Sequence, residues 1–71
     1  MTTAEFVSMD VASRLRYARE KKGCSAEEAA KAVGVSLSAI QMYECGKRVP
    51  RDSIKMELSR FYGVSVQRLF F

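Results

Sequence analysis

Apolar residues recur along this chain at helical spacing, in short stretches that glycines separate. In the first stretch, Val11, Leu15 and Ala18 stand at positions i, i+4 and i+7 and therefore share one face of a helix. Each of the four glycines follows such a stretch, at the position where a left-handed residue commonly ends a helix. No stretch alternates apolar and polar residues over a useful length. The pattern predicts five short helices, over about 10–22, 26–33 and 37–45, from about 52 onward, and over about 66–71.

Polar residues at the start of these stretches match helix N-caps. Ser25 and Glu28 form an S-x-x-E capping box. The carboxylate of Asp52 is placed to cap the helix that follows Pro50. Other expected caps are Asp10, Ser36 and Ser65. The predicted fold class is all-α, with one domain over residues 10–71. Residues 1–9 have neither helical periodicity nor the features of a signal peptide, and we expect them to form a flexible N-terminal arm.

The residue types that are absent from the composition exclude more classes of function than the residue types that are present suggest. The 71 residues include 12 Lys+Arg and 8 Asp+Glu, and the net charge of +4 favours a polyanionic partner, although the same surplus also keeps a small protein soluble. There is no histidine, which removes histidine-based triads, and two cysteines alone do not make a zinc site. We therefore expect no enzyme, no cofactor and no metal. No apolar run suits a membrane span, and free thiols suit the cytoplasm.

The most informative stretch is residues 25–45, SAEEAAKAVGVSLSAIQMYEC. A predicted helix ends at Gly34, and the next one begins only two residues later. Helices that cross steeply after so tight a turn need a small residue where they touch, which Ala30 supplies. They also need a turn residue that tolerates positive φ, which Gly34 supplies. Apolar contacts across the turn are expected from Val33, Val35, Ile40 and Tyr43. Together these features predict a helix-turn-helix.

With these segments in view, the chain resembles the Cro/repressor type of lambda-repressor-like helix-turn-helix domain, in the compact form found on phages and mobile elements. The matching segments are LRYAREKKGCS, AAKAVGVS, IQMYECGKRVP and LSRFYGVSVQRLF. The resemblance implies a five-helix bundle that binds double-stranded operator DNA, usually as a dimer. It also implies that Arg19, near the end of the first helix, pairs with Glu44, near the end of the third. Such a pair ties the first helix to the recognition helix.

The third predicted helix, about 37–45, is the expected recognition helix, whose N-terminal residues enter the major groove. With Ile40 and Tyr43 inward, the outward residues include the expected base readers Leu37, Ser38, Gln41 and Met42. Gln41 is the best direct reader because an amide pairs bidentately with adenine. Leu37 and Met42 stand where the family often has polar readers. They suit contact with thymine methyl groups, and the alternative is that they are exposed hydrophobes that bind a protein.

Cations cluster in the segment after that helix. They are Lys47, Arg48 and Arg51, with Lys55 one turn later. We expect the first three, together with Ser36, to bind DNA phosphates, which supply affinity and fix the register on the duplex. A solvated basic loop without a partner is the alternative.

A palindromic operator bound by a homodimer is the expected assembly, because one recognition helix reads only a few base pairs. The C-terminal helix is the expected contact between subunits. Its apolar residues are more than a short terminal helix easily buries, so some of them, with Tyr62, should be left for a partner; they are Val66, Leu69, Phe70 and Phe71. The alternative is that all of them pack inward, with Leu69 and Phe70 closing the bundle.

Two function classes follow from these observations. The first is sequence-specific binding of double-stranded DNA by a small transcriptional regulator, most simply a repressor. The second is a protein-interaction module, such as an antitoxin or an adaptor, built on the same fold. The salt dependence of binding to DNA distinguishes the two.

Overall fold

The computed structural model describes residues 9–71, so most of the expected N-terminal arm lies outside the described residues. The described chain folds into five helices and no strand, as the apolar spacing predicts. The helices are α2 (Val11–Lys22), α3 (Ala26–Val33), α4 (Leu37–Glu44), α5 (Asp52–Tyr62) and α6 (Val66–Phe70). The third and fifth helices each end one residue before the predicted boundary. No helix within residues 9–71 is long and apolar enough to cross a bilayer.

Side-chain caps begin four of the five helices at the expected residues. The capping box at α3 is complete, because Ser25 Oγ accepts from the Glu28 amide at 3.1 Å and Glu28 Oε1 accepts from the Ser25 amide at 2.8 Å. These bonds from Ser25 lower the pKa of the Glu28 carboxyl. Asp10, Ser36 and Ser65 cap α2, α4 and α6 in the same way.

The prediction of an Asp52 cap is wrong. The N-cap of α5 is Arg51, which makes no side-chain capping bond, and Asp52 is the first residue inside the helix. A capping side chain must stand just before the first turn to reach the amides two or three residues ahead. Asp52 stands one position too late and contributes only a negative charge near the helix N-terminus.

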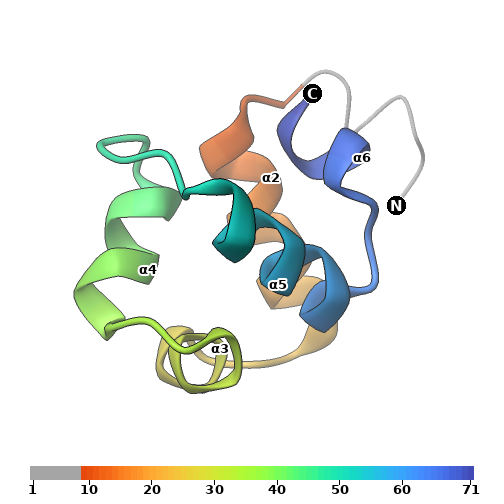
Figure 1. The fold of residues 1–71 in the computed structure, drawn as a ribbon. Helices are drawn as coiled ribbons and strands as arrows, with labels where there is room; N and C mark the ends of the chain where they lie inside the picture. The colour runs from red at the N-terminus through yellow and green to blue at the C-terminus, as the bar shows by residue number, and fades with distance from the viewer. Residues whose placement is uncertain (1–8) are drawn as a thin grey trace.

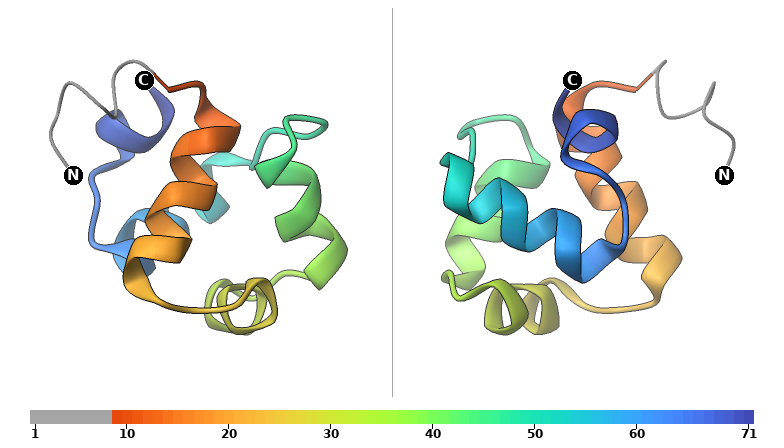
Figure 2. Two further views of the ribbon diagram at one scale, coloured as in Figure 1. Left: turned by 180° about the vertical axis from the view of Figure 1, so that it is seen from behind. Right: turned by 45° about the vertical axis from the view of Figure 1, so that its right-hand side comes forward.

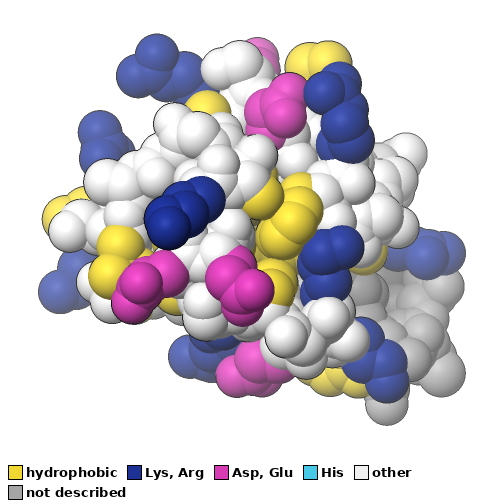
Figure 3. All heavy atoms as spheres, turned by 90° about the horizontal axis from the view of Figure 1, so that it is seen from below, with side chains coloured by type: hydrophobic (Ala, Val, Ile, Leu, Met, Phe, Trp, Pro, Cys, Tyr) yellow, Lys and Arg dark blue, Asp and Glu magenta, His cyan; other side chains and the backbone are white. Residues whose placement is uncertain are grey.

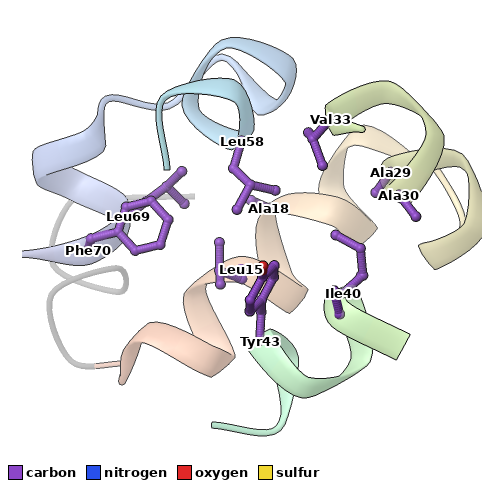
Figure 4. Close-up of a cluster of buried hydrophobic side chains, with 11 residues drawn as sticks. Leu15, Ala18, Ala29, Ala30, Val33, Ile40, Tyr43, Leu58, Leu69 and Phe70 are labelled. Atoms are coloured by element: carbon purple, nitrogen blue, oxygen red, sulfur yellow. The ribbon is translucent and has the colours of Figure 1, made fainter. Parts of the chain in front are cut away.

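The core joins all five helices (Figure 4). Four leucine or isoleucine side chains are at most 2% exposed, and each comes from a different helix. They are Leu15, Ile40, Leu58 and Leu69. The remaining helix, α3, contributes only Val33 and small alanines, so it packs closely on α4.

α4 and α6 lie on opposite sides of the molecule, with α2 and α5 between them (Figures 1 and 2). Leu69 and Phe70 of α6 are buried against the core and close the bundle. Phe71, in contrast, is 79% exposed. Leu69 and Phe70 therefore pack inward, as the second of the two expected arrangements has it, whereas Phe71 stays exposed, as the first has it.

Arg14 is a buried residue that the charge pattern does not identify. Although a charged side chain is normally exposed, Arg14 is 9% exposed, and its Nη1 donates to the carbonyl of Arg68 at 3.4 Å. Its position between Val11 and Leu15 supplies the missing i+3 member of the inward face. The helical spacing therefore marks position 14 as inward, although an arginine is normally expected at the surface.

Leu58→Ala tests the assignment of the core. Leu58 is 1% exposed, so the substitution should lower the free energy of unfolding by about 2–5 kcal/mol, enough to unfold much of so small a domain. Met56→Ala on the same helix is the control, because Met56 is 57% exposed and should cost less than about 0.5 kcal/mol. Urea unfolding followed by circular dichroism measures both. Equal effects of the two substitutions would contradict the core described above.

Candidate nucleic-acid interface

α4 divides into an inward and an outward face. Ala39, Ile40 and Tyr43 are buried against the core. The four residues predicted to read bases all lie on the exposed side of the helix; they are Leu37, Ser38, Gln41 and Met42. Leu37 is 36% exposed and Met42 is 42% exposed, which are large fractions for apolar side chains in a bundle with so small a core. The free side of α4 is therefore available to a partner.

The turn before α4 is held by backbone and side-chain hydrogen bonds. Gly34 ends α3 with φ 78°, and the amide of Val35 donates to the carbonyl of Ala30 at 3.0 Å. A Cβ at Gly34 would meet nothing within 4 Å, so glycine is needed there for the left-handed backbone alone. Ser36 Oγ accepts from the Ala39 amide at 3.1 Å. Since that bond uses a lone pair, the Ser36 hydroxyl still has a proton to donate to a ligand.

The far end of α4 is tied to α2 by a bidentate ion pair. Arg19 Nε donates to Glu44 Oε2 at 2.8 Å, and Arg19 Nη2 donates to Glu44 Oε1 at 3.1 Å. The third nitrogen, Nη1, donates to the carbonyl of Cys24 at 3.1 Å, which adds the start of the α2–α3 connection to the cluster. The two side chains are only 17% and 11% exposed. The hydrogen bond to Glu44 raises the pKa of Arg19 further above its ordinary value, so the guanidinium stays charged.

Tyr62 of α5 also interacts with the Arg19–Glu44 pair, a position that the sequence did not predict. Burial, and next the negative charge of Glu44, raise the pKa of the Tyr62 phenol. We had counted Tyr62 among the residues left for a second subunit, but it lies half-buried beside Arg19 and Glu44. Cys24 completes the group and is half-buried, with its Sγ 3.7 Å from the carbonyl of Arg19. No motif in the sequence links Tyr62 to a pair that lies on two other helices.

The loop between α4 and α5 presents cations, and its acidic neighbours are Glu44 and Asp52 at its two ends. Lys47, Arg48 and Arg51 are all exposed, and residues 45–51 include no carboxylate. Arg48 and Arg51 line a hollow of about 350 Å³ between the α3–α4 turn and the start of α5. The structure thus brings two of the predicted phosphate ligands together beside the helix-turn-helix.

Acidic residues are found elsewhere on the surface. Glu27 and Glu28 lie in the first turn of α3, and both are exposed. In Figure 3, which looks onto the α3 side, acidic and basic side chains are interspersed. A polyanion is better accommodated by the loop after α4 than by this mixed surface.

Lys55 does not extend the cationic loop. Its Nζ lies 5.4 Å from the ring centroid of Phe70 and 5.2 Å from that of Phe71. Lys55 therefore faces α6, where cation–π contacts hold it. Among residues 9–71, no group of histidine, cysteine or acidic side chains has the arrangement of a metal site.

Comparisons with known proteins agree with this geometry. Residues 15–69 match the family model described as helix-turn-helix. An uncharacterised HTH-type transcriptional regulator of Methanocaldococcus jannaschii is 31% identical over 58 residues, which cover 82% of this chain and 88% of the relative. The solution structure of the DNA-binding domain of the P22 C2 repressor superposes with a TM-score of 0.82 at 28% identity. That alignment covers 97% of this chain and 84% of the repressor domain.

A double-mutant cycle on Arg19 and Glu44 tests whether the ion pair holds α4. Arg19→Ala and Glu44→Ala should each lower the free energy of unfolding by more than about 1 kcal/mol, because each leaves a mostly buried charge unpaired. The double mutant should lose less than the sum, with a coupling energy of about 1–3 kcal/mol.

The exposed pair formed by Arg60 and Glu57 is the matched control. Their side chains are 72% and 41% exposed, so the same cycle should give a coupling below about 0.5 kcal/mol. Additive effects at Arg19 and Glu44 would show that the pair does not form in solution.

Proposed function

Because this chain belongs to the lambda-repressor-like helix-turn-helix family and is a DNA-binding transcriptional regulator, we propose that it represses transcription by placing α4 in the major groove of a specific operator. The observation that carries this proposal is the free outer face of α4 beside a loop of three exposed cations. Such a pairing supplies both parts of DNA recognition, since base contacts give specificity and phosphate contacts give position. The likeness to a phage repressor domain supports a role on a phage or mobile element.

Gln41 is the proposed direct reader of a base. It is exposed on α4, one turn after Leu37, and an amide side chain matches the N6 and N7 edge of adenine. Ser38 lies one turn before Met42 on the same outer side and has a hydroxyl that donates to or accepts from base edges. These residues provide the polar part of the proposed reading surface.

Lys47, Arg48, Arg51 and Ser36 are the proposed phosphate ligands. The hollow lined by Arg48 and Arg51 adjoins the α5 N-terminus, whose N-cap residue provides no side-chain acceptor for the first amides. A phosphate there would be attracted by two guanidinium groups and by the positive end of the α5 dipole, against the repulsion of the single Asp52 carboxylate in the first turn. The proposal gives the chain no catalytic role and places it in the cytoplasm with the DNA it binds.

A homodimer that binds a palindromic operator is the proposed assembly. Two recognition helices must lie about 34 Å apart, so each must lie about 17 Å from a two-fold axis. The domain measures 30 Å along its longest axis, and α6 lies on the side opposite α4, so contacts between α6 segments are compatible with this spacing (Figure 1). Phe71, which is 79% exposed, is the proposed anchor of that contact.

A protein-interaction module is the second candidate, and the exposure of Leu37 and Met42 favours it. Exposed apolar side chains on one helix are also typical of protein contacts. Binding to a duplex that weakens steeply as salt rises supports the regulator. Binding that is indifferent to salt supports the module instead.

Arg48→Ala tests the phosphate ligands. The substitution should weaken binding to all duplexes alike and reduce the slope of log K against log salt by about one unit, because one phosphate contact is lost. Arg60→Ala is the control, since Arg60 lies at the opposite end of α5 and should leave the slope unchanged. Fluorescence anisotropy at several salt concentrations measures both slopes. A slope unaffected by Arg48→Ala would rule out this contact.

Phe71→Ala tests the proposed dimer. Because Phe71 is exposed, the substitution should leave the unfolding midpoint almost unchanged while it weakens binding to a two-half-site operator and leaves binding to a single half-site intact. Phe70→Ala is the contrast, because Phe70 is 8% exposed and its loss should destabilise the fold by several kcal/mol, about 3–5. Light scattering with and without operator gives the stoichiometry. A wild-type chain that is monomeric without operator, and that binds the operator as a single monomer, would contradict the dimer.

A further inference from the structure

The exposed face of α4 carries no charged side chain. Glu44 is the only charged residue within Leu37–Glu44, and its carboxylate is turned toward Arg19. At about 100° per residue, the exposed residues span an arc of roughly 140°, with Leu37 at one edge and Met42 at the other. Gln41 and Ser38 lie between these edges. The face is therefore apolar at both margins and polar in the middle.

The side chains of Leu37 and Met42 are too far apart to form one continuous hydrophobic patch. They are separated by five residues, or about 7.5 Å along the helix axis, which is about two base-pair steps. Leu37 is the first residue of α4 and Met42 lies in its second turn. In a groove about 12 Å wide, each edge of the helix faces a different strand.

The major groove offers a single apolar group on its unmodified bases, the C5-methyl of thymine. Neither leucine nor methionine has a donor for guanine O6 or N7, and for the cytosine amino group leucine has no acceptor and methionine only a weakly accepting sulfur, so lost water is not replaced. Placing them over a G·C edge would leave those polar groups without partners. Placing them over a pyrimidine methyl buries apolar surface on both sides.

We infer that Leu37 and Met42 read C5-methyl groups of pyrimidines, one on each strand of the operator, on either side of the base pair that Gln41 contacts. This inference rests on the proposed function. The cations of the flanking loop favour DNA over an apolar protein surface as the occupant of this face, because Lys47, Arg48 and Arg51 are exposed beside it. Since the contact is to the methyl group itself, 5-methylcytosine should serve at the same positions.

Single-methyl substitution within one operator tests this reading. An operator is first selected from random duplexes with the full chain, and each thymine is then replaced in turn by deoxyuridine, which pairs identically and lacks only the methyl group. Removing a contacted methyl should weaken wild-type binding about fourfold. Replacing the same A·T pair by a G·C pair with 5-methylcytosine should recover part of the affinity that unmodified cytosine loses.

Matched protein variants assign each methyl to a side chain. Leu37→Ala should be insensitive to deoxyuridine at one position and Met42→Ala at another, on the opposite strand. Leu37 and Met42 are 36% and 42% exposed, so each variant should be somewhat less stable than the wild type but still folded, and circular dichroism checks this before binding is measured. Met56→Ala is the control, because Met56 is exposed on α5 and should respond to deoxyuridine as the wild type does.

Three results would overturn the inference. The wild type could keep its affinity for a deoxyuridine operator and still prefer it to random duplexes, in which case the regulator stands and methyl reading fails. The loss on deoxyuridine could be equal in all variants, which would assign the effect to DNA shape. If no duplex is selected at all, the proposed function fails and this inference fails with it.

Discussion

The ion pair between Arg19 and Glu44 sets the position of α4, and the candidate interface depends on that position. Glu44 is the last residue of α4, so the pair holds this end of the helix against α2 through two hydrogen bonds. The Ser36 cap and the packing on α3 hold the other end. With both ends fixed and Ile40 buried, helical geometry leaves only one side of α4 free. The two side chains are only 17% and 11% exposed, which strengthens their electrostatic attraction.

The exposed cations, the outer face of α4 and the exposed C-terminal ring lie on different parts of the domain. The exposed cations of the α4–α5 loop lie beside α4, whereas α4 itself presents apolar and neutral polar groups. α6 lies on the other side of the bundle (Figure 2). Lys55 contacts Phe70 and Phe71 there and does not face the loop. The proposed function assigns phosphate contacts, base contacts and the contact between subunits to these three different parts of a very small protein.

Much of the fold was predictable because local rules determine it. Apolar spacing, capping residues such as Ser25 and the glycine at position 34 act within a few residues, so the sequence displays them directly. The features that sequence reasoning missed depend on packing between distant segments. The burial of Arg14 under α6, the position of Tyr62 beside Glu44, and the contact of Lys55 with the C-terminal rings each join different helices. From the sequence, Tyr62 was expected at a subunit contact, Lys55 was grouped with the cations after α4, and nothing marked Arg14 as buried.

Binding-site selection with paired variants tests most directly whether the outer face of α4 reads DNA bases. Wild type, Gln41→Ala and Met56→Ala are each used to select duplexes from one random pool; Met56 is exposed on α5 and serves as the control. Gln41→Ala should lose preference at one base position per half-site, at a cost of about 1–3 kcal/mol, and keep the others. Met56→Ala should select the wild-type site. Identical selected sites for all three proteins would show that α4 does not read a base through Gln41.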